Sequence, residues 1–142
     1  MPILDFNEIR DDFQFLEEWE DRYRYLIELG RKLEPLPEGD HTPENKVSGC
    51  ASQVWLLTKV DAEGRLHFVG DSDAHIVRGL IAVLIALFDG KKPDEIDDTD
   101  AAALFSELGL EGHLSTQRSN GLRSMIRRIK ADAAAERGAA TT

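Results

Sequence analysis

The chain has 142 residues, of which 31% are charged, and its formal net charge is −10 with a pI of about 4.8. This length is typical of one domain, residues 1–142, that buries about 70% of its unfolded surface, so folding requires neither a metal nor a disulfide. The acidic balance argues against nucleic acid as a partner, because phosphate binding needs a clustered positive surface.

Two amphipathic helices are predicted at the start of the chain. The pattern Asp5-x-x-Glu8 resembles a capping box, which satisfies free backbone amides at a helix start. Helical spacing of apolar residues follows at Phe6, Ile9, Phe13 and Leu16. A second helix is predicted over about residues 19–32, and it ends before Pro35 because proline cannot continue a helix.

The middle of the chain predicts an antiparallel hairpin. After a loop over residues 34–45, apolar and other side chains alternate over residues 54–60, which is typical of a strand. Residues 61–64 have turn composition, and residues 66–69 are predicted to form the return strand. Because two strands alone are marginally stable, residues 45–48 are expected to add a short third strand, or a helix to cover the sheet.

Helices are predicted for most of the second half. A helix capped by Ser72 or Asp73 runs to about Asp89, and it is apolar on so many sides that we expect it to be central. Pro93 and the cluster Asp97-Asp98-Thr99-Asp100 are expected to introduce a short helix that runs through Leu108. The element order then predicts an α+β fold, a small antiparallel sheet of about three strands with helices packed on one face.

The last predicted helix begins at Ser115 or Thr116. Its expected inner stripe comprises Leu122, Met125, Ile126, Ile129 and Ala133, and its expected outer face carries Arg123, Arg127, Arg128 and Lys130. Residues 138–142 are expected to fray.

Positive charge is concentrated in this last segment. Residues 118–142 carry a net charge of +4, so the rest of the chain carries −14. Such a stripe is usually a solvated helix face. The alternative is a docking surface for an acidic patch on a partner protein.

The location of the protein can be anticipated from two segments. Residues 1–5 lack the basic and then apolar layout of a signal peptide. The longest apolar run, residues 79–88, has about half the length that a membrane span needs. We therefore expect a soluble, cytoplasmic protein with no membrane partner.

No cofactor or metal site is expected from the sequence. The four histidines form no pair at i and i+4 and no HExxH motif, and the rest of a calcium loop does not follow Asp71 and Asp73. Neither GxGxxG nor a P-loop occurs, so a nucleotide site has no support. The carboxylates of Asp71 and Asp73 are better explained as helix caps.

Cys50 is the one cysteine, and it lies in the segment Val47-Ser-Gly-Cys-Ala-Ser-Gln-Val-Trp55. One thiol excludes an internal disulfide and a four-thiolate zinc or iron–sulfur site on this chain alone. A free cysteine is usually a small buried hydrophobe, but a neighbouring glycine and serine favour a displayed thiol. A lone reactive thiol suits a transfer protein, a one-cysteine peroxidase or a redox sensor.

Four segments together resemble the SufE family of sulfur acceptors. They are residues 47–55, 70–74, 76–82 and 113–122, and the resemblance extends over about residues 5–135. It implies an α+β fold of the IscU/SufE type, with the acceptor thiol sheltered in an apolar hollow at rest and swung outward on the partner. One departure is Thr116, where many relatives have proline.

The resemblance also implies a function and partners. Cys50 would accept persulfide sulfur from a pyridoxal-phosphate-dependent cysteine desulfurase (SufS/CsdA-like), stimulate that enzyme, and deliver sulfur to an iron–sulfur cluster scaffold. The chain would then be a sulfur carrier and activator, not a free-standing enzyme, with no cofactor of its own. The main SufE branch and a paralogous CsdE-like branch both remain open. A scaffold that holds iron would need several cysteines, and this chain has one.

Three further residues match the family segments and are candidates for supporting roles. Arg118 would contact the partner or favour the thiolate of Cys50, or else serve only the helix start. Asp73 is first a helix cap, and second a residue that orients the acceptor loop or binds the desulfurase. Gln53 would support the same loop. The competing interpretations are a one-cysteine thiol peroxidase or redox-sensing adaptor, and a structural adaptor whose cysteine is inert.

Overall fold

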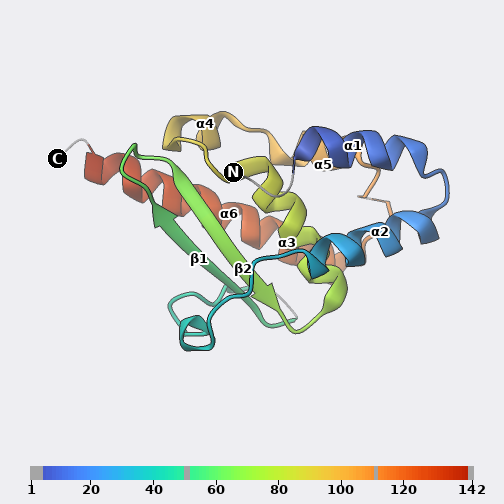
Figure 1. Cartoon of the computed structure of the whole chain (residues 1–142), viewed down its shortest axis with the longest axis horizontal. Helices are drawn as coiled ribbons and strands as arrows, with labels where there is room; N and C mark the ends of the chain where they lie inside the picture. The colour runs from blue at the N-terminus through green and yellow to red at the C-terminus, as the bar shows by residue number, and fades with distance from the viewer. Residues whose placement is uncertain (1–4, 50–51, 111, 141–142) are drawn as a thin grey trace.

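The computed structural model describes residues 5–49, 52–110 and 112–140, and it has the expected α+β architecture (Figure 1). Figure 1 shows α6 running behind the hairpin, and α3 between the hairpin and the pair formed by α1 and α2. The elements in chain order are α1 (Phe6–Phe15), α2 (Trp19–Arg31), the short 3-10 helix η1 (Glu38–Asp40), β1 (Val54–Val60), β2 (Leu66–Ser72), α3 (His75–Phe88), α4 (Pro93–Asp98), α5 (Ala101–Glu107) and α6 (Thr116–Ala140).

The sheet is an antiparallel hairpin of two strands, not the three that the sequence predicted. Its register runs from the Val54–Ser72 pair to the Val60–Leu66 pair, so β2 is longer than expected. In the described part of the chain, the expected third strand is reduced to one bridge, between Lys46 and Trp55. Turns precede and follow Lys46, so the chain leaves the sheet before a ladder can extend.

Helix α3 is the centre of the fold, as its composition predicted. Ten of its 14 residues are buried, and it contacts β2, α2, α1 and α6. The buried side of β1, with Val54 and Leu56, joins the same core. A helix that is apolar on nearly every side is stable only when other elements cover it, and here the hairpin and the remaining helices do so.

Helices α2 and α3 cross closely because both carry glycine at the contact. A Cβ added at Gly79 would collide with the carbonyl oxygen of Leu26. A Cβ added at Gly30 would lie 2.8 Å from the backbone nitrogen of Gly79 and 2.9 Å from the Cβ of Arg78. The two backbones are therefore in direct contact, and no larger residue fits between them without a shift of the helices.

Three local features differ from what the sequence led us to expect. The short helix through Leu108 is present as α5, which Asp100 caps by accepting a hydrogen bond from the amide of Ala103, but a separate helix, α4, that was not predicted precedes it. Neither Ser72 nor Asp73 caps α3, whose N-cap residue is Ala74.

The third error concerns the outer face of α6, where Arg128 and Lys130 are half-buried. Lys130 Nζ donates to the carbonyl oxygens of Asp97 and Thr99, at 3.3 and 2.9 Å, and so binds the junction of α4 and α5. Arg123 and Arg127 are exposed, as predicted. Ser115 caps α6, because its hydroxyl accepts a hydrogen bond from the amide of Arg118 at 3.2 Å.

Across the described residues, no helix combines the length and the hydrophobicity that crossing a membrane would require.

We predict that Gly79→Ala destabilises the fold by about 1–3 kcal/mol, because the methyl group overpacks the crossing of α2 and α3. The free energy of unfolding can be measured by urea denaturation followed by circular dichroism. Gly39→Ala is the matched control, since a Cβ there meets nothing within 4 Å, and it should change stability by less than about 0.5 kcal/mol. Equal stabilities of the two variants would contradict the close crossing.

Candidate functional site

The candidate site is organised around the segment that carries Cys50. Cys50 itself, with Ala51, lies outside the described residues. The chain on both sides is described, and we call residues 44–49 the first arm and residues 52–54 the second arm. The site can therefore be built from what holds each arm and what surrounds it.

The first arm is paired with β1 and then turns onto α6. The amide of Val47 donates to the carbonyl of Val54 at 2.8 Å, and the Val47 side chain is buried. Gly49 has a φ of +86°, which side-chain-bearing residues rarely adopt. A Cβ added there would lie 2.6 Å from Ser124 Oγ. Glycine is therefore required at position 49 for two reasons: the backbone has a positive φ, and the chain approaches α6 too closely for a side chain.

Arg128 holds the first arm against α6. Its guanidinium donates to the carbonyl of Glu44 at 2.8 Å and to the carbonyl of Lys46 at 3.4 Å. Asp132, one turn later, accepts from Arg128 Nε at 3.2 Å, and it also accepts from the Thr58 hydroxyl at 2.7 Å. A charged donor that binds backbone carbonyls while paired with a carboxylate is firmly oriented. The pair formed by Arg128 and Asp132 therefore connects the first arm and β1 to α6.

Asp73 holds the second arm. Its carboxylate accepts a hydrogen bond from the amide of Gln53 at 3.1 Å, and its own amide donates to the Gln53 carbonyl at 3.3 Å. This contact continues the hairpin one step beyond the Val54–Ser72 pair. The prediction that Asp73 is first a helix cap is wrong, because its carboxylate is engaged with Gln53. Asp73 and Gln53, both singled out from the sequence, meet through this contact.

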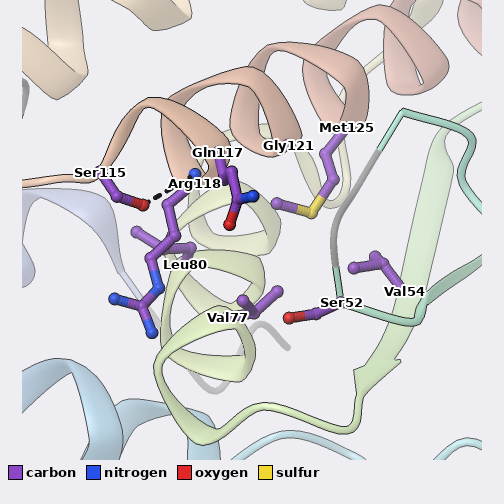
Figure 2. A pocket seen from close by; sticks show the side chains of 9 residues that line it. All are labelled: Ser52, Val54, Val77, Leu80, Ser115, Gln117, Arg118, Gly121 and Met125. Carbon is purple, nitrogen blue, oxygen red and sulfur yellow. Dashed lines mark hydrogen bonds between the residues drawn. The ribbon is translucent and has the colours of Figure 1, made fainter.

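A hollow of about 250 Å³ lies beside the second arm (Figure 2), and we call it the Ser52 hollow. Ser52 lies at its edge, and its walls come from β1, α3 and α6. Figure 2 shows Arg118 reaching from the first turn of α6 to the rim of this hollow. The lining residues are Ser52, Val54, Val77, Leu80, Ser115, Gln117, Arg118, Gly121 and Met125. The lining is therefore mixed: four side chains are apolar, three are neutral and polar, and the exposed Arg118 supplies the one charge.

Comparison with known proteins identifies the family. The family described as "SufE: Fe-S metabolism associated domain" matches residues 7–133. The chain belongs to the SufE family. Its role accordingly lies in iron–sulfur metabolism, and the resemblance seen in the sequence is confirmed.

Two curated relatives of this SufE-family chain cover nearly its whole length. An uncharacterized SufE-like protein of Rhizobium meliloti (strain 1021) is 61% identical over 134 residues, which are 92% of this chain and 96% of the relative. An uncharacterized SufE-like protein of Rhizobium etli is 54% identical over 134 residues, which are 92% of this chain and 90% of the relative.

A solved structure shares the fold. The solution structure of a hypothetical protein from Thermus thermophilus matches with a TM-score of 0.75 at 22% sequence identity, over 96% of each chain. At this identity the match supports the α+β fold of the SufE-family chain and nothing about its activity.

The sequence did not single out the residues that hold the first arm. Arg128 was assigned to the outer face of α6 because it lies off the apolar stripe, and its partner Glu44 is 84 residues away. Ser124 likewise carries no sequence signal for its contact with Gly49. Long-range contacts of this kind depend on how α6 is rotated against the hairpin, and periodicity alone does not specify them.

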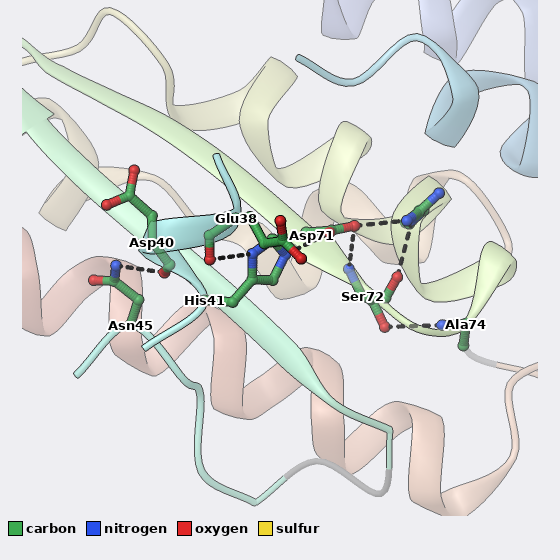
Figure 3. A network of polar contacts seen from close by, with 8 residues as sticks. Glu38, Asp40, His41, Asn45, Asp71, Ser72 and Ala74 are labelled. Atoms are coloured by element: carbon green, nitrogen blue, oxygen red, sulfur yellow. Dashed lines mark hydrogen bonds and ion pairs between the residues drawn. The ribbon is translucent and has the colours of Figure 1, made fainter. Parts of the chain in front are cut away.

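A polar network connects the loop before the first arm to β2 (Figure 3). Asp71 accepts from Ser72 N at 2.8 Å and from Arg78 Nε at 2.9 Å, and its second oxygen lies 2.8 Å from His41 Nε2. The His41 ring also packs edge-on against Trp55, with centroids 4.7 Å apart. The hydrogen bond to Asp71 raises the pKa of His41 above its ordinary value of 6.5. Asp71, expected to cap a helix, instead links the loop, β2 and α3.

Within the described ranges, no group of three His, Cys, Asp or Glu side chains could hold a metal ion. Cys50 and Glu111 fall outside those ranges, so the expectation that the chain has no metal stays a prediction.

We predict that Asp71→Asn lowers the pKa of His41 toward 6.5, because the charged hydrogen-bond partner is lost. Histidine resonances followed by NMR across pH 5–9 measure it. In the wild type, the stabilising contribution of the His41–Asp71 pair is complete below pH 6.5 and is lost as the pH rises through the raised pKa. An unchanged His41 pKa in the variant would show that Asp71 is not the cause.

We predict that Asp73→Ala speeds hydrogen exchange of the Gln53 amide by about five- to tenfold, because a charged acceptor is removed from that amide. Exchange can be followed residue by residue by NMR. Asp98→Ala is the control, since the Asp98 side chain is exposed and has no hydrogen bond or ion pair within the part of the chain that the structure describes. Equal Gln53 exchange in both variants would rule out an anchoring role for Asp73.

Proposed function

We propose that this SufE-family chain is a cytoplasmic sulfur carrier. It takes persulfide sulfur from a pyridoxal-phosphate-dependent cysteine desulfurase onto Cys50, stimulates that enzyme, and delivers the sulfur to an iron–sulfur cluster scaffold. The proposal is supported by the family, by the single thiol, and by the two arms that adjoin it.

The transfer step needs no oxidant. The Cys50 thiolate attacks the outer sulfur of the donor persulfide, and the sulfur–sulfur bond within the donor breaks. The donor cysteine leaves as a thiolate, and Cys50 now carries the persulfide. One sulfur atom moves and the number of electrons is unchanged, so a single cysteine on each protein suffices.

The observation that carries the proposal is the Ser52 hollow beside the second arm. Ser52 lines this hollow and is two residues from Cys50, a separation of at most about 7 Å along the chain. A persulfide exposed to solvent is lost to small thiols or oxidants. A space of about 250 Å³ within reach of Cys50 therefore offers shelter between the two transfers.

Arg118 has a chemical role in this proposal. An apolar environment raises the pKa of a thiol, whereas a nearby cation favours the thiolate. Arg118 lines the mouth of the same hollow as Ser52 and is exposed, so it is available to a thiolate or to the partner. Asp73 supports the reaction indirectly, because it holds the backbone of Gln53 three residues after Cys50.

The proposal predicts a mass increase of about 32 Da on Cys50 after incubation with a cysteine desulfurase and free cysteine. Mass spectrometry of the intact protein and of its peptides measures it. Cys50→Ser should show no increase and should no longer stimulate the desulfurase, while its circular dichroism spectrum stays that of the wild type.

Two results would contradict the sulfur-carrier proposal. A gain of oxygen with peroxide, and none of sulfur with the desulfurase, would favour a one-cysteine peroxidase or redox sensor. Full stimulation by Cys50→Ser would favour an adaptor whose cysteine is inert.

A further inference from the structure

A second hollow, of about 380 Å³, lies between the first arm and α6. The first arm and α6 both contribute to its wall, which consists of Lys46, Val47, Ser48, Gly49, Ser124, Arg127 and Arg128. It shares no lining residue with the Ser52 hollow. We call it the cationic hollow, because three of its seven lining residues are basic and none is acidic.

This accumulation of positive charge stands out in a chain with a net charge of −10. The charge of Arg128 is compensated by Asp132, but the guanidinium of Arg127 has just one partner among the described residues, the neutral hydroxyl of Ser124, to which it donates at 3.1 Å. The ammonium group of Lys46 has no ion pair or hydrogen bond to any residue that the structure describes. Two positive charges at the hollow are therefore uncompensated by the residues that the structure describes.

The shape of the positive region favours a protein partner over a small anion. Lys46, Ser48, Gly49 and Arg127 line the opening of the hollow to solvent. Arg123 is exposed, and it lies four residues before Arg127 on α6, which places it about 6 Å away on the same helix face. The charge thus continues beyond the hollow as a stripe, which matches an acidic surface segment.

We propose that the cationic hollow is the docking point for an acidic segment of the cysteine desulfurase, with an Asp or Glu side chain between Lys46 and Arg127. This inference rests on the proposed function. Sulfur passes by direct attack, so the donor must cover the residues next to Cys50. Gly49 is bonded to Cys50 and lines this hollow, so the hollow lies within the footprint of any donor.

Charge complementarity here would set the orientation of the complex. The residues before Arg118 carry a net charge of −14 and therefore repel an acidic partner. The cationic hollow attracts the same partner at a place next to Cys50. Complementary charges raise the rate of encounter and select one docking geometry. The two hollows then have separate roles, one toward the carried sulfur and one toward the partner.

The test reverses the two uncompensated charges. Lys46→Glu combined with Arg127→Glu should raise, by about tenfold, the carrier concentration that half-saturates stimulation of each cysteine desulfurase of the source organism. The maximal stimulated rate should stay within about twofold, since Cys50, Gly49 and the lining of the Ser52 hollow are unchanged. Binding measured in a Cys50→Ser background should weaken by the same factor, and circular dichroism should be unchanged.

The matched control makes the same change in net charge at the far end of the hairpin. Lys59 and Arg65 are exposed there, near the turn between β1 and β2. Lys59→Glu combined with Arg65→Glu should change half-saturation by less than about twofold, because exposed charges more than about 10 Å away are screened at about 0.1 M salt. Raising the salt to about 1 M should bring the wild type toward the hollow variant.

The outcomes separate this inference from the proposed function. Sulfur transfer to Cys50 with unchanged half-saturation in the hollow variant would overturn the inference and leave the carrier function standing. Unchanged half-saturation with slower removal of sulfur by free cysteine or glutathione would also overturn it, and would assign the hollow to a small anionic thiol. If no cysteine desulfurase transfers sulfur to the wild-type protein, the proposed function is rejected, and the inference that rests on it is rejected as well.

Discussion

The burial of α3 is the constraint on which the rest of the structure depends. Ten of its residues are buried, and at Gly79 its backbone touches α2 directly. Burying an apolar helix of this size is a dominant favourable term in folding, so the hairpin and the other helices take positions that cover it. The same helix supplies Val77 and Leu80 to the Ser52 hollow. The surroundings of the second arm are therefore a consequence of how the core is closed.

Helix α6 links this core to the site through two different faces. Its apolar stripe, including Met125 and Ile129, is buried against the rest of the protein. The adjoining polar face holds the first arm through the Ser124 contact and the Arg128 hydrogen bonds. Since Asp73 holds the second arm from the start of α3, the chain around Cys50 is anchored by two elements that are distant in sequence.

The two hollows differ in their charge. The Ser52 hollow has a mixed lining with a single arginine, and three of the residues that line the other hollow are cations. A partly enclosed space excludes part of the solvent, whereas a cationic surface attracts an acidic partner. The proposed carrier would need both properties, protection of the bound sulfur and recognition of the donor, and each hollow adjoins one of the two arms.

The sequence by itself determined the elements, the central helix, the hairpin, the lone thiol and the family. These features are local, because periodicity, turn composition and short motifs need only neighbouring residues. The tertiary structure decided that Asp73 binds Gln53 instead of capping α3, that Arg128 turns inward to the carbonyl of Glu44, and that the third strand stops at one bridge. Polar side chains have several possible partners of similar strength, and which one is within reach depends on how helices and strands pack. Features that depend on neighbouring residues could therefore be predicted from the sequence, whereas contacts between residues far apart in the chain were decided by the tertiary structure.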